Sequence, residues 1–285
     1  MTSALFRPDR VTILGVLNAT PDSFSDGGRF VVGEAAVDVE RGVECAAALL
    51  QAGAHVIDVG GESTRPGAPE VPAAVEMARA VRLIEAIAKR LDVTLSIDTR
   101  KAEVAEAALA AGASIVNDVS GLRHDPALAE VAARAGAGLV LGHLRGTPQT
   151  MQHDPNFHDA IAEVAAELGE SVARARAAGV PDARIAVDPG IGFGKRLEDN
   201  LVLLAGPRAL RARLGLPVLV GPSRKSFLGA LTGDPVGERD RASLAACAVA
   251  VFAGADAVRV HDVAGAVRAV AVARALRDAA REGTP

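Results

Sequence analysis

The sequence has few cysteines, no long apolar run and no concentrated basic segment. Its two cysteines, Cys45 and Cys247, each lie in an Ala/Val-rich pattern typical of a helix, so we expect buried reduced thiols rather than a disulfide or a redox pair. The longest apolar stretch, Leu244 to Ala255, is well short of the ~20 residues that span a bilayer. Residues 1–10 lack the apolar segment of a secretory signal, so we expect a cytoplasmic protein.

The charge balance argues against a nucleic-acid or membrane-surface partner. The chain has 31 basic and 35 acidic residues, a formal net charge of −4, and its basic residues form no block. Both kinds of partner need a concentrated basic face. Hydrophobic residues make up 49% of the chain, enough to bury a large core, and glycine and proline are too few and too aperiodic for a fibrous protein. Small-molecule chemistry is therefore the expected class.

Short β-branched runs alternate with longer Ala-rich segments of helical periodicity, a pattern typical of a parallel sheet with helical crossovers. Eight runs are nearly all apolar, as strands buried on both faces must be. They are Val11–Val16, His55–Val59, Thr94–Ile97, Ser114–Val116, Gly138–Leu141, Ile185–Val187, Val218–Val220 and Ala257–Val260. Eight such units in about 250 residues predict one (β/α)8 TIM barrel, an α/β fold, as a single domain over residues 1–285 with a core from about 11 to 281. An open doubly wound sheet is the alternative, but it needs fewer strands.

Two helices can be placed from local signals. The segment from Glu34 to Leu50 puts Val39, Val43 and Ala46 on one stripe, which predicts an amphipathic helix that covers the barrel. Asp125 followed by Pro126 predicts a helix start, with the aspartate as N-cap and the proline at the first helical position.

Polar residues follow all eight runs, at the strand ends where a (β/α)8 barrel carries its catalytic groups. They are Asn18, 60–65, Asp98, Asn117 with Asp118, His143, Asp188, 223–225, and Arg259 with His261. Any one of them could simply cap the next helix, but all eight together favour one site. Asp98, Asp188 and Asn117 supply hydrogen-bond acceptors, whereas the cationic set is Arg65, Lys225, Arg259 and His261. This division suits a ligand with a hydrogen-bonding heterocycle at one end and an anion at the other.

Two glycine-rich loops flank this expected site. The loop from Asp188 to Lys195 is no P-loop, because Pro189 and Arg196 stand where that motif needs Gly and Ser/Thr. We interpret its glycines as leaving space for a flat ligand beside the backbone, with Phe193 stacked on an aromatic ring of that ligand. The polar loop from Asn18 to Gly28 is long enough to close as a lid.

The histidines do not predict a zinc site. His143, His153 and His158 lie near Asp154 and Asp159, but their spacing matches no zinc pattern and has no companion cysteine. A hard cation such as Mg²⁺, held by Asn18 and by phosphate oxygens of a substrate, fits better, because Mg²⁺ prefers oxygen and few protein ligands. No Ser/His/Asp or Cys/His nucleophile arrangement is readable.

These motifs resemble those of the bacterial dihydropteroate synthases, a family of pterin-binding folate-pathway enzymes and the target of sulfonamides. The matching segments follow the family order: 18–28, 58–67, 97–99, 117–118, 143–152, 188–195, 221–226 and 259–262. The resemblance implies a TIM-barrel transferase that condenses (7,8-dihydropterin-6-yl)methyl diphosphate with 4-aminobenzoate to give 7,8-dihydropteroate and diphosphate. It also implies Mg²⁺ as cofactor and a homodimer.

The resemblance also implies roles for individual residues. The pterin would be held by Asp98, Asn117, Asp188 and Lys225, and the diphosphate by Arg259, His261, Thr64 and Arg65. The 4-aminobenzoate would be framed by Phe24, Arg65, Pro66, Phe193 and Ser223, and Asn18 would hold Mg²⁺. Of these, Lys225, Arg259, His261 and Asp98 would be catalytic.

Three positions depart from the family pattern: Leu144 replaces a more usual Met, Pro222 precedes Ser223, and Arg100 adds a charge near the barrel mouth. None removes a motif residue. Two other functions are open on the sequence: a non-catalytic barrel that binds another protein, and a pterin-binding methyltransferase module. The first predicts losses in the loops at Asn18 or Thr64, and the second has no need of the cations at 259–261.

Overall fold

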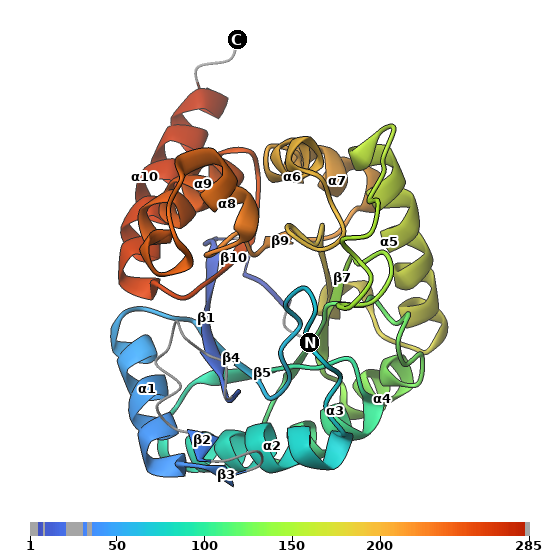
Figure 1. Ribbon diagram of the computed structural model, residues 1–285, viewed down its shortest axis with the longest axis vertical. Helices are drawn as coiled ribbons and strands as arrows, with labels where there is room; N and C mark the ends of the chain where they lie inside the picture. The colour runs from blue at the N-terminus through green and yellow to red at the C-terminus, as the bar shows by residue number, and fades with distance from the viewer. Residues whose placement is uncertain (1–4, 8, 21–30, 33–35, 283–285) are drawn as a thin grey trace.

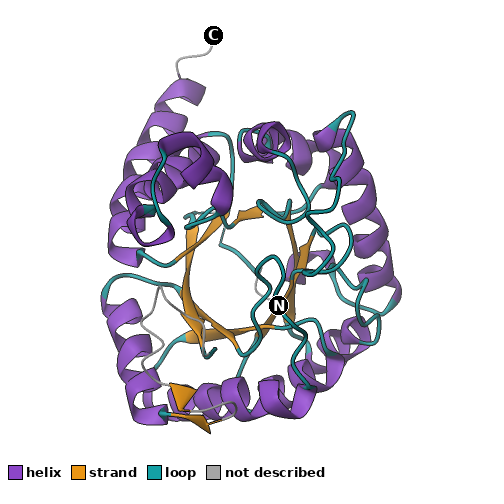
Figure 2. Cartoon of the chain, in the orientation of Figure 1, coloured by secondary structure: helices purple, strands orange, loops and turns teal. Residues whose placement is uncertain are grey.

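The computed structural model describes residues 5–7, 9–20, 31–32 and 36–282, and its main feature is a ring of parallel strands inside a ring of helices (Figures 1 and 2). The strands are β1 Thr12–Asn18, β4 Val56–Gly60, β5 Thr94–Asp98, β6 Ile115–Asp118, β7 Gly138–Gly142, β8 Ile185–Asp188, β9 Leu219–Val220 and β10 Ala257–Val260. They pair in the order β8-β7-β6-β5-β4-β1-β10-β9. A parallel bridge between Val187 and Val218 joins the two ends of this sheet, so the barrel is nearly closed. The predicted TIM barrel is confirmed.

All eight predicted runs form strands, and β1, β5, β6 and β8 extend to include the polar residue that follows the run. Asn18, Asp98 and Asp188 are thus the last residues of β1, β5 and β8. Outside the barrel, β2 Val31–Val32 and β3 Ala36–Val37 form a small antiparallel pair that the sequence did not predict.

The outer ring consists of α1 Val39–Gln51, α2 Ala73–Arg90, α3 Ala102–Ala110, α4 Leu128–Ala135, α5 Ala160–Ala177, α6 Leu197–Leu204, α7 Pro207–Leu214, α8 Ser226–Thr232, α9 Asp240–Phe252 and α10 Val263–Glu282. Short 3-10 turns lie at Asp182–Arg184 and Val236–Glu238. The helix predicted over 34–50 begins only at Val39, because the Asp38 side chain accepts a hydrogen bond from the amide of Arg41 and caps the helix there.

The predicted helix start at Asp125 is wrong by two residues, because α4 begins at Leu128. One Asp125 oxygen accepts from the amide of Ala127 at 3.1 Å and caps a turn. The other accepts from the amide of Ala102 at 2.8 Å, at the start of α3. The aspartate therefore serves a helix that precedes it in the chain.

The barrel core has two apolar layers. The larger layer lies between the strands and the helices. The smaller layer lies inside the ring of strands and consists of Phe6, Leu14, Val56, Ile115, Val140, Ala186, Leu219 and Ala257. Leu5 packs against this inner cluster, and its amide donates to the carbonyl of Ala183 at 2.7 Å. The N-terminal segment thus covers the apolar end of the barrel, which leaves the opposite end for polar groups.

Within the described residues, no helix is both long and apolar enough to cross a bilayer. Cys247 is buried, as the sequence predicts, whereas Cys45 is only half-buried. Burial raises the pKa of the Cys247 thiol to about 12, so this thiol is unreactive near neutral pH.

Candidate active site at the mouth of the barrel

A layer of polar side chains lies directly above the inner apolar cluster. Side chains two apart on a strand face the same way, so the residue two positions after each inner apolar residue also faces the barrel interior. The residues at this level are Val16, Asp58, Asn117, Gly142, Asp188, Gly221 and Arg259. Asp98, two positions after the buried Ser96, lies opposite Asn117 in the register of β5 and β6. Since all strands are parallel, these residues meet at one end of the barrel.

Arg259 ties three strands of this layer together. Its Nε donates to Asp58 Oδ2 at 2.5 Å, and its Nη2 donates to Asp98 Oδ2 at 2.7 Å. Asn117 Nδ2 donates to the same Asp58 oxygen at 3.0 Å. Although burial alone would lower the pKa of Arg259, the two carboxylates raise it above its ordinary value. The predicted acceptors and cations therefore interlock here rather than occupying separate ends.

Asp58 is a site residue that sequence reasoning did not single out. It is fully buried and lies inside β4, so it was counted as part of an apolar run. The two-residue period from Val56 could have found it, because this period places Asp58 on the inner face of the strand.

Asp98 is buried in the mouth, and burial raises its pKa above the ordinary value, while the nearby guanidinium of Arg259 opposes this shift. Its Oδ1 has no hydrogen-bond partner among the described residues. A buried carboxylate oxygen without a partner is costly, so a ligand that donates a hydrogen bond to it would be bound favourably.

The glycine-rich loop after β8 shapes the wall beside Asp188. Gly190 has φ +68°, its amide donates to Asp188 Oδ1 at 2.7 Å, and a Cβ at this position would collide with the carbonyl of His143. A Cβ at Gly192 would lie 2.9 Å from Lys225 Cδ. Burial raises the pKa of Asp188. The glycines of this loop therefore allow close packing against His143 and Lys225, whereas the predicted space for a flat ligand stays a prediction.

Lys225 and Phe193, predicted for the two substrates, contact each other. The ammonium of Lys225 lies 3.6 Å from the centroid of the Phe193 ring, a cation–π arrangement. Burial and the charge of Arg259 lower the pKa of Lys225 to about 8, while Asp188 and Asp98 oppose this shift. Lys225 therefore lies between the carboxylates of the mouth and the aromatic ring.

Ser223 and His261 form a second polar pair at the rim. Ser223 Oγ lies 2.8 Å from His261 Nδ1 and also accepts from the His261 amide at 3.2 Å. Burial, with the positive charges of Arg224 and Arg259, lowers the pKa of His261 to about 3. The ring is therefore neutral near pH 7 and acts as a hydrogen-bonding group. The prediction that His261 belongs to the cationic set is wrong in this respect.

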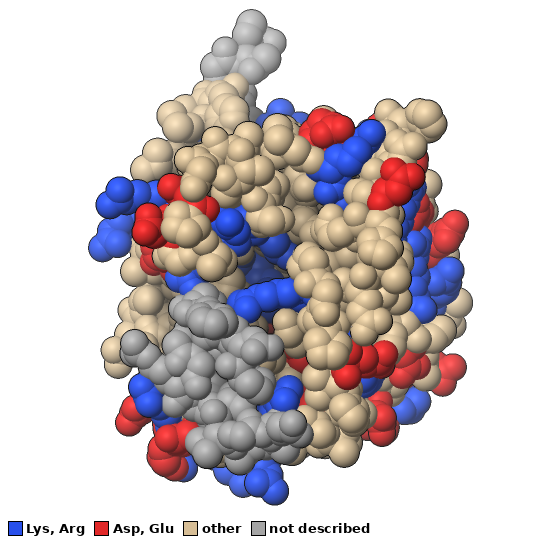
Figure 3. Space-filling model, viewed as in Figure 1, with Lys and Arg blue, Asp and Glu red and all other residues tan. Residues whose placement is uncertain are grey.

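The segment after β4 brings the remaining predicted residues to the rim. Thr64 is half-buried, whereas Arg65 and Pro66 are exposed. The positive charge of Arg65 acts on the pKa of both Lys225 and His261, which places Arg65 near them. Lys and Arg side chains surround a hollow near the centre of this face (Figure 3). Phe24 lies outside the described residues.

Three of the polar residues that follow strands serve the scaffold instead. Asp118 is fully buried and accepts from the amides of Ser120 and Leu122. Arg224 pairs with Asp240 at 2.6 Å. His143 is buried, with Lys195 on Nδ1 at 2.9 Å and Glu167 on Nε2 at 3.1 Å. Sequence position alone could not separate these residues from those that face the mouth.

The residues present fit a magnesium ion that has few protein ligands. The side-chain oxygen of Asn18 and Asp98 Oδ2 lie 3.6 and 3.7 Å from the point where a Cβ at Gly60 would stand, so both border the same space. The described residues contain no group of three or more His, Cys, Asp or Glu that could hold a metal. An ion here would take one amide oxygen, while substrate phosphates and water would supply the other ligands.

Comparisons with known proteins agree with this geometry. The model of the family described as pterin binding enzyme matches residues 14–261. A dihydropteroate synthase of Synechocystis sp. is 46% identical over 268 residues, covering 94% of this chain and 90% of the relative. The dihydropteroate synthase of Escherichia coli K12 is 43% identical and covers 94% of this chain and 92% of the relative.

Solved structures show the same likeness. The Yersinia pestis dihydropteroate synthase in a sulfonamide complex has a TM-score of 0.88 at 41% identity, with 95% of each chain covered. The Xanthomonas albilineans enzyme with 7,8-dihydropteroate has a TM-score of 0.81 at 39% identity, with 97% of this chain and 95% of that chain covered. The chain therefore belongs to the family of pterin binding enzymes and, within it, to the dihydropteroate synthases.

Proposed function

We propose that the barrel mouth condenses (7,8-dihydropterin-6-yl)methyl diphosphate with 4-aminobenzoate, releasing diphosphate and forming 7,8-dihydropteroate. The observation that carries this proposal is the polar layer of Asp58, Asp98, Asn117 and Arg259, with Asp188 and Lys225 beside it. It offers acceptors for a heterocycle and cations for a leaving anion within one end of the barrel. The relatives named dihydropteroate synthase favour this reaction over that of a methyltransferase module.

The pterin would bind in the layer itself. Its ring N–H and amino groups would donate to the carboxylates of Asp98 and Asp188, while Asn117 can both donate and accept. The unpartnered Oδ1 of Asp98 is the acceptor best prepared for this role. Lys225 would donate to an acceptor atom of the pterin ring. Its ammonium lies near both carboxylates, so the lysine and the carboxylates can bind the same ring.

The diphosphate would leave toward the cations of the rim. The bond between the exocyclic carbon and the diphosphate oxygen breaks, so negative charge grows on the leaving group. Arg65 at the rim, with Arg259 in the layer below, would stabilise this charge. Thr64 and the neutral His261 would add hydrogen bonds to phosphate oxygens. A magnesium ion held in part by Asn18 would supply further charge neutralisation when bound.

The arylamine needs little activation by the protein. It is already neutral at pH 7, so it can attack the exocyclic carbon directly and lose its proton afterwards. Phe193, Pro66 and Ser223 would frame its ring, and Arg65 would pair with its carboxylate. Phe24 completes the set proposed for this substrate. Because Lys225 contacts the Phe193 ring, it lies where the two substrates would meet.

An assay of diphosphate release tests the proposal. Release should require the pterin diphosphate, 4-aminobenzoate and Mg²⁺, with loss of rate when any one is left out. Lys225→Ala should abolish product while the far-UV circular dichroism spectrum stays unchanged. Lys89→Ala is the matched control, because Lys89 forms an exposed pair with Glu85. Full activity of Lys225→Ala would contradict the assigned site.

A homodimer and a cytoplasmic address are also proposed. Apolar side chains are exposed on two adjacent helices: Val249 and Phe252 on α9, and Val272 and Leu276 on α10. A second copy of the chain would cover them. The buried thiol of Cys247 suits a reducing compartment such as the cytoplasm, which cell fractionation would test.

A further inference from the structure

We propose that Arg100 is a positioning residue that fixes the 63–71 segment of the rim through a buried ion pair with Glu62. The inference rests on the proposed function, because this segment carries Thr64 and Arg65.

Arg100 forms an ion pair with Glu62, the residue that precedes the segment. Its side chain is 5% exposed, and Nη2 donates to Glu62 Oε2 at 3.0 Å. Glu62, with a side chain that is 3% exposed, lies immediately before the segment. An ion pair so well shielded from water is screened little by salt and fixes both partners.

Glu62 also closes the segment on itself. Its other oxygen, Oε1, accepts from the amide of Val71 at 2.9 Å, so one carboxylate binds the residue at the far end of the segment. Between these ends, the amide of Gly67 donates to the carbonyl of Pro148 at 2.9 Å. The path of the backbone at Arg65 therefore depends on where the Glu62 carboxylate is held.

Arg100 balances the negative charge of the carboxylates at the start of the segment. Lys101 Nζ is shared between Glu62 at 3.1 Å and Glu76 at 2.7 Å, so two carboxylates face two cations. Burial opposes ionisation of Glu62, but the Val71 amide, Arg100 and Lys101 keep its pKa below the ordinary value. Without Arg100, Lys101 alone would face two buried carboxylates, and the Glu62 side chain would have to move toward water.

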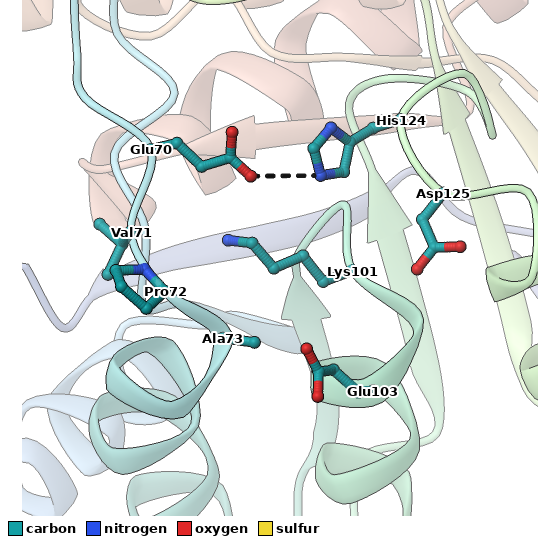
Figure 4. A pocket seen from close by; sticks show the side chains of 8 residues that line it. All are labelled: Glu70, Val71, Pro72, Ala73, Lys101, Glu103, His124 and Asp125. Carbon is teal, nitrogen blue, oxygen red and sulfur yellow. Dashed lines mark ion pairs between the residues drawn. The ribbon is translucent and has the colours of Figure 1, made fainter.

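An open groove borders the end of the segment, so packing on that side adds little support to the ion pair. Val71 and Pro72 line one side of the groove and Lys101 another, and its volume is about 520 Å³ (Figure 4). Across the groove, Glu70 reaches His124 only at 3.5 Å, and the Glu70 side chain is 58% exposed. An exposed pair of this kind contributes little. Among the described residues, the bond from the Val71 amide to Glu62 is thus a partly buried restraint on this end of the segment.

Two substitutions at Arg100 test the proposal. Arg100→Met removes the charge at similar size, and Arg100→Lys restores a charge. We expect Arg100→Met to raise the KM for 4-aminobenzoate about tenfold or more. The Kd of a pterin that lacks the diphosphate should change less than about twofold, since strand residues hold the pterin ring. Amide exchange over 63–71 should be faster, with α2 and α3 unchanged. Arg100→Lys should recover most of both losses, and Arg90→Met, which breaks an exposed pair with Glu40, should change neither.

Other outcomes would overturn the proposal. Equal losses of affinity for 4-aminobenzoate and for the pterin that lacks the diphosphate would show a general scaffold role. Unchanged exchange over 63–71 in Arg100→Met would show that Arg100 does not hold the segment. If Arg100→Met does not fold, Glu62→Gln provides the same test. A wild-type protein without synthase activity would refute the proposed function, yet the exchange experiment would still decide whether Arg100 holds the segment.

Discussion

At the scale of single residues, the site depends on which side chains of a strand face inward. Asp98, Asn117 and Asp188 could be predicted from the sequence because they end apolar runs. Asp58 could not be found this way, since it lies between Ile57 and Val59 and only the two-residue period places it inside. Position at a strand end does not by itself identify a site residue. His143 follows β7, but its side chain pairs with Lys195 and Glu167. Burial and partners, which sequence does not report, decide between catalysis and scaffold.

Asp58→Asn should weaken both the fold and the site. The substitution removes one of the two carboxylates that hold Arg259 and leaves a buried charge only partly compensated. We expect the free energy of unfolding to fall by about 3 kcal/mol and kcat/KM for the pterin diphosphate to fall at least about tenfold. Denaturant unfolding and steady-state kinetics measure the two effects.

The control for Asp58→Asn is Asp9→Asn, which breaks the exposed pair with Arg7 and should change the free energy of unfolding far less. Equal losses for both variants would argue that Asp58 does no more than a surface carboxylate.

His143 should make the fold less stable in mild acid. Burial and the charge of Lys195 lower its pKa from 6.5 to about 4, although Glu167 opposes the shift. Between these values the unfolded chain binds the proton and the folded chain does not, so the free energy of unfolding falls as pH is lowered through this window. Relative to His143→Gln, the wild type should lose up to about 3 kcal/mol between about pH 6.5 and pH 4.

The measurement is chemical denaturation of wild type and His143→Gln at several pH values across that window. Parallel curves for the two proteins would mean that His143 takes up its proton as readily in the folded state as in the unfolded chain.

At the scale of elements, apolar runs predicted the strands well, whereas helix starts were less predictable. A strand buried on both faces has a continuous apolar signal, and all eight were found. A helix start depends on which amide a side chain caps. Asp38 caps α1 four residues after the expected start at Glu34, and Asp125 caps a neighbour in space. The second case involves residues 23 apart in the chain, which no local pattern reports.

Asp125→Ala should therefore weaken the start of α3 more than that of α4. The variant loses the bond to the Ala102 amide at 2.8 Å and the bond to the Ala127 amide at 3.1 Å. We expect a loss of about 1 kcal/mol in the free energy of unfolding, typical of a lost cap. Faster amide exchange at Ala102 would identify the helix affected. Asp92→Ala, at an exposed aspartate after α2, is the control; exchange that speeds up only in α4 would contradict the assignment.

At the scale of the whole molecule, the barrel places apolar and polar chemistry at opposite ends. Leu5 and Phe6 cover the apolar end of the barrel. The side chains two positions further along the same strands carry the charges. The sequence predicted this barrel because eight similar units repeat, and it predicted the rim because parallel strands share a direction. It could not predict that Arg259 binds Asp98, since the two lie 161 residues apart.

The exposed apolar side chains of α9 and α10 give the last prediction, which concerns assembly. If a second copy covers Val272 and Leu276, which are 62% and 58% exposed, Leu276→Glu would bury a charge in the interface and dissociate the dimer. Light scattering after size-exclusion chromatography should give a dimer mass for the wild type and a monomer mass for Leu276→Glu. Val202→Glu, at a site on α6 that is 49% exposed, should remain dimeric. A monomeric wild type at micromolar concentration would refute the homodimer.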